Sequence, residues 1–187
     1  MQILPSLQFG LQNGWVLWIA YFIGLILSVL AYPTDKRKKL FSEPTYPRGD
    51  PRRAILAVGS IAAVMFITST LFVPLILGGP LLYVGLSAYV LGYLAVMISL
   101  HEYRHAPVDS IVETGLYRFS RNPQWLGLVM VFLGTALAMG SGLHLFLLAV
   151  VVISYHFRIL CEEQVCEAAY GESYTRYKRR VPRYLIV

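Results

Sequence analysis

Residues 118–163 read RFSRNPQWLGLVMVFLGTALAMGSGLHLFLLAVVVISYHFRILCEE, with charged groups at both ends and a long apolar middle. Residues 122–157 contain no Asp, Glu, Lys or Arg. Gly140-Ser141-Gly142 divides this region into apolar runs at about 124–139 and 143–157, each shorter than the roughly 20 residues of a full membrane crossing. We therefore predict a short helical hairpin whose two ends lie on the same side of a membrane.

Three further apolar runs precede the hairpin, at about 15–32, 54–77 and 80–100. Gly78-Gly79-Pro80 leaves room for only a tight turn between the last two of them. Hydrophobic residues make up 57% of the 187-residue chain and charged residues only 14%, which excludes an ordinary soluble domain. The pattern predicts an all-α integral membrane protein with about five transmembrane helices.

The basic residues are confined to the segments between the apolar runs. All 16 lysines and arginines lie in residues 33–53, 101–121 and 158–187. Five spans put these three segments on one side of the membrane, which the positive-inside rule assigns to the cytoplasm. The N-terminus is then outside and the C-terminus cytoplasmic. Orientation and contact with anionic membrane lipids explain the net charge of +6, so we expect no nucleic-acid partner.

We predict one membrane domain over residues 1–187, with three N-terminal spans in 1–100 and the hairpin and tail in 101–187. The sequence of residues 158–187 predicts a helix that leaves the membrane and ends near Gly171. A second short helical piece, Ser173 to Arg180, then ends before a proline. These last residues would form a cytoplasmic cap over the hairpin.

The two cysteines, Cys161 and Cys166, are five residues apart in the tail. No further cysteine and no close pair of histidines accompanies them, so neither a disulfide framework nor a zinc site is indicated. We therefore expect both to pack against other residues, and we expect no metal cofactor.

Charged side chains gather at the ends of the predicted hairpin. Glu162-Glu163 follow its second helix, and Arg158 shares a helix face with Glu162 at the i, i+4 spacing. Arg118 and Arg121 precede its first helix and are spaced so that they can face one site. Both groups also have a plain structural interpretation, as an ion pair that ends a span and as a basic flank beside lipid phosphates. Adjacent acids, however, also suit a positively charged ligand.

Together, TGLYRFSRNPQWLG at 114–127 and RILCEEQVCEAAYGESYTRYKRRVPR at 158–183 resemble the isoprenylcysteine carboxyl methyltransferase family. That family belongs to a wider group of membrane methyltransferases that includes the phospholipid methyltransferases. The resemblance covers about residues 101–187 and rests on the Gly-Leu-Tyr…Arg-x-Pro block, the Glu-Glu pair and the Tyr-Gly…Tyr…Tyr…Val-Pro tail. It implies S-adenosylmethionine as the cofactor, bound at the cytoplasmic ends of the last two spans and covered by the C-terminal segment.

The resemblance also implies roles for individual residues. Arg158 and Glu162 are the expected catalytic residues, with Arg158 near the acceptor group. The family usually has histidine where this chain has Asn122, which cannot titrate, so we expect this position to hold the cofactor and not to transfer protons. The expected cofactor-binding residues are Asp109, Ser110, Ile111, Val112, Tyr117, Asn122, Pro123, Gln124, Trp125, Glu162 and Glu163.

The chemistry of such a cofactor agrees with these residue types. S-adenosylmethionine is a sulfonium cation with an amino-acid end and an adenosine. The two glutamates can meet its amine or ribose hydroxyls, and backbone N–H groups near Gly115 can meet its carboxylate. Tyr117 or Trp125 can pack on the adenine. A carboxylate acceptor needs only an orienting cation such as Arg158, whereas an amine or thiol acceptor needs a base, for which one of the glutamates is available.

These features predict a membrane methyltransferase that acts on a lipophilic acceptor, such as an isoprenylcysteine-type carboxylate or a phospholipid amine. One alternative is a sterol-reductase-like oxidoreductase with a reduced nicotinamide cofactor, although such enzymes are usually much longer. The other is a non-catalytic membrane protein that keeps the fold, which only Asn122 favours. The compact length suggests a multi-pass protein of a prokaryotic inner membrane, with its active site facing the cytoplasm.

Overall fold

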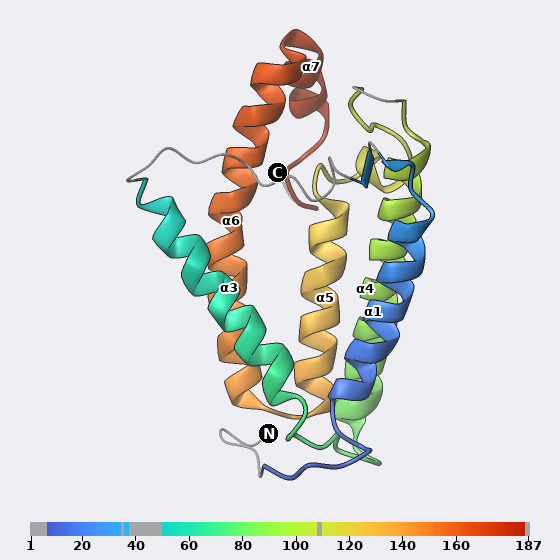
Figure 1. Ribbon diagram of the computed structural model, residues 1–187, viewed down its shortest axis with the longest axis vertical. Helices are drawn as coiled ribbons and strands as arrows, with labels where there is room; N and C mark the ends of the chain where they lie inside the picture. The colour runs from blue at the N-terminus through green and yellow to red at the C-terminus, as the bar shows by residue number, and fades with distance from the viewer. Residues whose placement is uncertain (1–6, 35, 38–49, 108–109, 186–187) are drawn as a thin grey trace.

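The computed structural model describes residues 7–34, 36–37, 50–107 and 110–185, and it places them in a helical bundle with a small cap at one end (Figure 1). These residues contain helices and no β-strand, which confirms the predicted all-α fold. In chain order the elements are α1 Trp15–Leu30, α3 Arg52–Ser69, α4 Pro80–His105, the 3₁₀ helix η1 Gly115–Arg118, α5 Pro123–Ala138, α6 Gly142–Tyr170 and α7 Glu172–Arg180.

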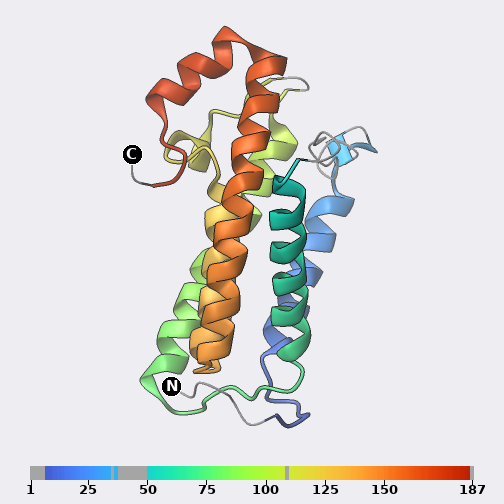
Figure 2. The same ribbon diagram turned by 90° about the vertical axis from the view of Figure 1, so that its left-hand side faces the viewer.

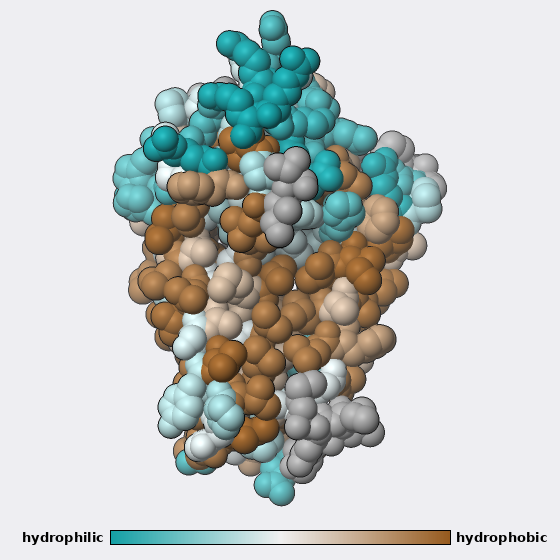
Figure 3. Space-filling model, turned by 180° about the vertical axis from the view of Figure 1, so that it is seen from behind, coloured by the Kyte–Doolittle hydropathy of each residue, from teal (hydrophilic) through white to brown (hydrophobic). Residues whose placement is uncertain are grey.

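The bundle has the surface of a membrane protein. On the face seen in Figure 3, hydrophobic residues cover its middle, and hydrophilic residues gather at the end that carries α7. Helices α3, α4 and α6 are long and apolar enough to cross a membrane, whereas α1 and α5 are apolar but have only 16 residues each. The protein is therefore an integral membrane protein. The exact number of spans, about five from the sequence, stays a prediction.

The second apolar run forms a shorter helix than expected. We predicted a span over 54–77, but α3 ends at Ser69. The hydroxyls of Thr68, Ser69 and Thr70 each donate to a carbonyl oxygen three or four residues earlier, and Pro74 cannot continue a helix. The apolar residues after Ser69 form turns, because hydropathy reports apolar character and not helical hydrogen bonding.

The fifth apolar run belongs to a much longer helix than expected. We predicted a short helix at 143–157, but α6 is continuous over 29 residues. Arg158 ends the apolar run without ending the helix, because its Nε donates to Glu162 Oε1 at 2.8 Å, one turn further on. Gly171, at a φ of +55°, ends α6 as predicted, and α7 follows it. One helix therefore runs from the apolar bundle into the cap.

Helices α4 and α5 pack closely because both present glycine at their interface. Gly85 lies against Gly134, and Gly92 lies against Gly127. A Cβ atom on Gly134 would stand 2.4 Å from the backbone nitrogen of Tyr89, and one on Gly92 would stand 2.5 Å from the carbonyl oxygen of Gly127. Small residues permit such an approach between membrane helices, where van der Waals contact drives association. This pair forms a firm wall on which the polar end of the bundle is built.

Helix α3 packs on α6, and a buried histidine joins them at the end opposite the cap. His144 is fully buried, with its Nε2 2.9 Å from the Ser69 hydroxyl and its Nδ1 2.8 Å from the Ser141 hydroxyl. The Phe66 ring meets the imidazole edge-on at 4.7 Å. Both ring nitrogens have partners, so this histidine has a structural role inside the bundle.

The described parts of the three basic segments meet at the end that carries α7 (Figure 2). The C-terminal ends of α1 and α4, the N-terminal ends of α3 and α5, and the last turns of α6 all lie at this end. Lys36 follows α1 and donates to the carbonyl oxygen of Arg104 at 2.6 Å, which ties α1 to the last turn of α4. That this basic end faces the cytoplasm stays a prediction.

Candidate active site

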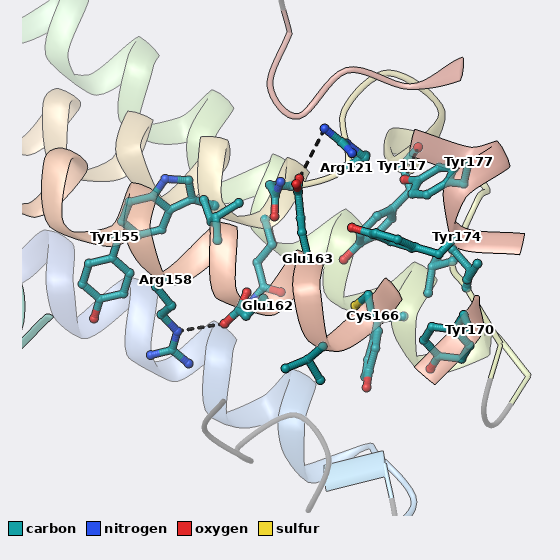
Figure 4. Close-up of a pocket in the computed structure, with 18 of the residues that line it drawn as sticks. Tyr117, Arg121, Tyr155, Arg158, Glu162, Glu163, Cys166, Tyr170, Tyr174 and Tyr177 are labelled. Atoms are coloured by element: carbon teal, nitrogen blue, oxygen red, sulfur yellow. Dashed lines mark hydrogen bonds and ion pairs between the residues drawn. The ribbon is translucent and has the colours of Figure 1, made fainter. Parts of the chain in front are cut away.

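A cavity of about 860 Å³ lies at the basic end of the bundle, under the cap that α7 forms (Figure 4). Its volume falls within the range of small-molecule sites, about 300–1,000 Å³. All helices except α3 contribute to the described lining, which consists of Tyr21, Tyr103, Ser110, Ile111, Val112, Tyr117, Arg121, Asn122, Gln124, Trp125, Leu128, Tyr155, Arg158, Ile159, Glu162, Glu163, Val165, Cys166, Tyr170, Tyr174 and Tyr177.

The cavity brings together most of the residues that the sequence singled out. Pro123 is not part of the lining, because it is buried in the first turn of α5, where its fixed φ suits the start of a helix. Asp109 lies outside the described residues. The roles of all these residues stay predictions. Those in the lining are Ser110, Ile111, Val112, Tyr117, Asn122, Gln124, Trp125, Arg158, Glu162 and Glu163.

Helix α6 contributes one continuous face to the cavity. Side chains three and four residues apart lie on the same side of a helix, and the lining residues follow that spacing for about 22 Å. They begin at Tyr155 in the bundle and end at Tyr170 in the cap: Tyr155, Arg158, Ile159, Glu162, Glu163, Val165, Cys166 and Tyr170.

Arg158 and Glu162 form the polar pair nearest the apolar bundle. Their ion pair of 2.8 Å is partly exposed. The Arg158 guanidinium lies 5.7 Å from the centre of the Tyr155 ring, and Trp125 of α5 stacks on that ring at 4.6 Å, almost parallel. A planar cation on an aromatic surface at the edge of the apolar region can orient an anionic group.

Glu163, although next to Glu162, is buried and held by two arginines. Arg183 donates from Nε and Nη2 to its two carboxylate oxygens at 3.0 and 2.9 Å. The Nη2 atom of Arg121 lies 3.3 Å from Oε1 of the same carboxylate. The hydrogen bond to Glu163 raises the pKa of the Arg183 guanidinium. This Arg121–Glu163–Arg183 cluster carries two positive charges against one negative charge.

Arg121 is buried more deeply than its charge would suggest. Its side chain is only 8% exposed. Its backbone N–H donates to the carbonyl oxygen of Pro182 at 2.9 Å, which fixes the segment before α5. Within the part of the chain that the structure describes, its Nε and Nη1 atoms are buried without a hydrogen-bond partner.

The turn at Gly115 is formed over a carboxylate from α4. Both Glu102 oxygens accept from the Leu116 N–H at 3.0 Å, and the Tyr117 N–H donates to the Thr114 carbonyl oxygen at 3.0 Å. Gly115 has a φ of +53°, and a Cβ atom there would stand 1.5 Å from Glu102 Oε1. The position therefore requires glycine. Two N–H groups that we expected to meet a cofactor carboxylate already have acceptors within the chain.

The C-terminal strap, residues 181–184, crosses the segment before α5. Asn122 Nδ2 donates to the carbonyl oxygen of Arg183 at 3.0 Å. On the other side, His156 Nδ1 lies 2.7 Å from the Tyr184 hydroxyl. Asn122 therefore holds the strap with the amide that replaces the family histidine, while its side chain also lines the cavity.

Two tyrosines of the cap belong to the site although we did not predict them. Tyr174 and Tyr177 are three residues apart on α7 and face the cavity, and burial raises the pKa of both phenols. The Tyr177 hydroxyl donates to the carbonyl oxygen of Tyr117 at 2.8 Å. The signal for them in the sequence is the i, i+3 spacing of Tyr174 and Tyr177 in the tail, which places both on one face of a helix. Of the two arginines expected to be able to face one site, Arg121 lines the cavity and Arg118 is exposed outside the described lining. Other residues in the lining without a predicted role are Tyr21, Tyr103, Leu128, Tyr155, Ile159, Val165, Cys166 and Tyr170.

Comparison with known proteins adds a family and one curated relative. Residues 73–173 match the family described as phospholipid methyltransferase. Over 73 residues the chain is 30% identical to the Protein-S-isoprenylcysteine O-methyltransferase of Schizosaccharomyces pombe, which covers 38% of this chain and 31% of the relative. The aligned segment is thus less than a third of the relative's length. No solved structure matches the chain.

Proposed function

This chain belongs to the phospholipid methyltransferase family, whose match covers more than half of it, and we propose that it is an S-adenosylmethionine-dependent methyltransferase that modifies a lipophilic acceptor in the membrane. Family membership supports the reaction class. The main structural support for this proposal is a single cavity that residues of both sequence motifs line. It lies at the boundary between the apolar bundle and the polar cap.

The lining fits S-adenosylmethionine in size and chemistry. A cavity of about 860 Å³ can hold an adenosine with an amino-acid side arm. The Glu162 carboxylate suits an amine or ribose hydroxyls, and Tyr117 and Trp125 offer aromatic surface for the adenine. When bound, the cofactor supplies an electrophilic methyl group. The residues that we propose to hold it are Ser110, Ile111, Val112, Tyr117, Asn122, Gln124, Trp125, Glu162 and Glu163, with Pro123 setting the start of α5 and Asp109 adjoining them in sequence.

The contacts favour an acceptor that is already anionic. An amine would have to lose a proton, but Glu162 is paired with Arg158 and Glu163 with two other arginines, so protonating either carboxylate would break an ion pair. Asn122 cannot accept a proton in place of histidine. A carboxylate needs only orientation, which Arg158 can supply. The name of the fission-yeast relative, an O-methyltransferase of isoprenylcysteine, points the same way.

The chain's own residues would then act by alignment and exclusion of water. The Arg158 guanidinium would hold the acceptor carboxylate, and the ion pair to Glu162 would fix the guanidinium in place. Tyr21 and Leu128 extend the lining toward the apolar bundle, where the lipid part of the acceptor would lie. The cap tyrosines would keep water from the reacting groups. We propose that this end faces the cytoplasm of a prokaryotic cell.

Methylation assays can test the function and the acceptor together. Purified protein in detergent would be incubated with methyl-labelled S-adenosylmethionine and either a prenylcysteine with a free carboxylate or phosphatidylethanolamine. We expect label in the prenylcysteine product and release of that label as methanol in mild base, because a methyl ester hydrolyses and an N-methyl group does not. A Glu162→Gln variant should bind the cofactor less tightly in calorimetry.

Other outcomes would redirect the assignment. Base-stable label in the phospholipid would make the amine the acceptor. Tight binding of a reduced nicotinamide cofactor, with no binding of S-adenosylmethionine, would support the reductase alternative. Binding without transfer to any member of a lipid extract would support a non-catalytic protein.

A further inference from the structure

The Arg121 guanidinium has an environment that calls for an anion. Two of its nitrogens, Nε and Nη1, are buried and have no partner among the described residues, although the side chain lines the cavity and is only 8% exposed. Buried charged donors are rarely left without acceptors, because water no longer solvates them. An anion that enters the cavity beside Arg121 and displaces the groups covering one of these nitrogens would supply it with a hydrogen-bond acceptor.

The position of this guanidinium is fixed by its neighbours. Glu163 engages Nη2 from one side, and Arg183 in turn occupies both oxygens of Glu163. The backbone N–H of Arg121 is bonded to Pro182 in the C-terminal strap. The guanidinium is thus held before any ligand arrives, which lowers the entropic cost of binding.

The net charge of the Arg121–Glu163–Arg183 cluster favours a ligand group with a single negative charge. Arg121 and Arg183 together exceed Glu163 by one positive charge. Glu162, the other carboxylate in the described lining, is paired with Arg158. A monoanionic carboxylate would neutralise the cluster and accept charge-assisted hydrogen bonds from Arg121.

The two arginines of the cavity lie at different ends of it. Figure 4 shows Arg158 beside Tyr155, near the bundle, and Arg121 on the far side of Glu163, next to the cap residues Tyr174 and Tyr177. The acceptor enters from the apolar side in the proposed function, so the cap side is left for the polar end of the methyl donor. Two of the backbone N–H groups near Gly115, those of Leu116 and Tyr117, are already bonded within the chain.

We propose that Arg121 binds the carboxylate of the methionine moiety of S-adenosylmethionine, with a carboxylate oxygen that accepts from the N–H of Nε or of Nη1. This assignment rests on the proposed function. Glu163 is then a positioning residue, because it orients Arg121 and links it to the strap. The sequence alone could not separate Arg121 from Arg118, which is exposed and absent from the described lining.

Calorimetry with two matched ligands tests the assignment without using turnover. S-adenosylmethionine and its decarboxylated form differ only in the carboxylate. We expect the parent protein to bind the carboxylated ligand at least about tenfold more tightly. Arg121→Gln should lose about tenfold or more in affinity for S-adenosylmethionine and should bind the decarboxylated ligand within about twofold of the parent. Arg118→Gln, the matched control, should leave both affinities unchanged.

Several other results would overturn the assignment of Arg121. Equal affinity of the parent for both ligands would overturn the assignment, and this measurement needs no variant. Equal weakening of both ligands by Arg121→Gln, or of neither, would also overturn it, as would loss of prenylcysteine binding with cofactor affinity intact. Arg121→Lys, which keeps the charge, serves if Arg121→Gln does not fold, and we expect partial loss for the carboxylated ligand alone. A parent protein that binds neither ligand would refute the proposed cofactor itself.

Discussion

At the scale of single residues, the adjacent acids of α6 have separate surroundings. Glu162 is partly exposed beside Arg158, and Glu163 is buried between Arg121 and Arg183. Successive residues of a helix point about 100° apart, so neighbours in sequence meet different parts of the fold. From the sequence, only Glu162 had an expected partner, Arg158. The contacts of the two glutamates assign one to the open part of the cavity and the other to the attachment of the strap.

Replacing Arg158 by lysine separates a catalytic role from a structural one. If Arg158 orients the acceptor carboxylate, its planar donor group matters and a lysine point charge cannot replace it. We expect Arg158→Lys to keep its melting temperature and its affinity for S-adenosylmethionine while turnover falls roughly tenfold to a hundredfold. Arg176→Lys, on the exposed surface of α7, should leave turnover unchanged. Turnover of Arg158→Lys within about twofold of the parent would assign Arg158 to the ion pair alone.

Gly115 and Gly171 offer a matched pair for testing the turn over Glu102. Both have φ near +55°, but a Cβ atom on Gly171 meets nothing within 4 Å. We expect Gly171→Ala to lower the free energy of unfolding by about 1–3 kcal/mol from backbone strain alone, because its ψ of −127° lies outside the left-handed helical region. Gly115→Ala should cost about 2–4 kcal/mol, because Glu102 must also release the Leu116 N–H. Thermal unfolding in detergent would compare them, and equal losses would contradict the contact with Glu102.

At the scale of elements, the contact of α4 with α5 depends on the absence of side chains. Gly85 and Gly92 on one helix meet Gly134 and Gly127 on the other at backbone distance. The end of α4 carries Tyr103, and the start of α5 carries Gln124 and Trp125, so this contact also sets the spacing of two walls of the cavity.

We therefore expect Gly134→Ala to force the two helices apart. The new Cβ atom would stand 2.4 Å from the Tyr89 backbone nitrogen, and backbone cannot move aside as a flexible side chain can. The free energy of unfolding should fall by about 1–3 kcal/mol, and affinity for S-adenosylmethionine should fall with it. At Gly79 an added Cβ would meet only Ile76 Cγ2, at 3.5 Å, so Gly79→Ala is the control. A melting temperature equal to that of the control would refute the close contact.

The cap should lose stability in alkaline solution. Burial raises the pKa of Tyr174 and Tyr177 above the ordinary value of 10.0. A raised folded-state pKa stabilises the fold below the unfolded pKa, and that contribution disappears as pH rises from about 10 toward the folded-state value. The melting temperature should therefore fall above pH 10, and Tyr177→Phe should fall less steeply because phenylalanine cannot ionise. Tyr83→Phe, an exposed position, should keep the parent slope, and identical slopes in all three proteins would contradict this origin.

At the scale of the whole molecule, the basic end and the cap coincide, which predicts that the cavity faces the cytoplasm. Cysteine labelling can test this after Cys161 and Cys166 are replaced by alanine. In intact cells, a membrane-impermeant maleimide should label Leu77→Cys, which is exposed at the opposite end of the bundle, and should spare Arg176→Cys. Opening the membranes should make both reactive. Labelling of only Arg176→Cys in intact cells would reverse the orientation.

The pattern of apolar runs was enough to predict helices that begin near Trp15, Pro80 and Pro123, because glycine, proline and charge mark their limits. It failed where helix ends depend on hydrogen bonds: hydroxyls end α3 at Ser69 inside an apolar run, and an ion pair carries α6 past Arg158. The motifs identified most of the cavity lining. The i, i+4 spacing was enough to predict the pair of Arg158 with Glu162, but not the partners of Glu163, which come from distant segments.

The continuity of α6 has a consequence for how this chain can change in length. Its lining residues keep their positions only while they remain in register over the turns from Tyr155 to Tyr170. One inserted residue would rotate everything beyond it by about 100° and move it about 1.5 Å along the axis. An alanine inserted after Phe157 should therefore abolish cofactor binding in calorimetry, whereas an alanine inserted after Gly79, in the turn before α4, should leave it intact. Among related proteins, we expect selection to remove insertions and deletions from this part of α6 and to tolerate them in the connections between helices.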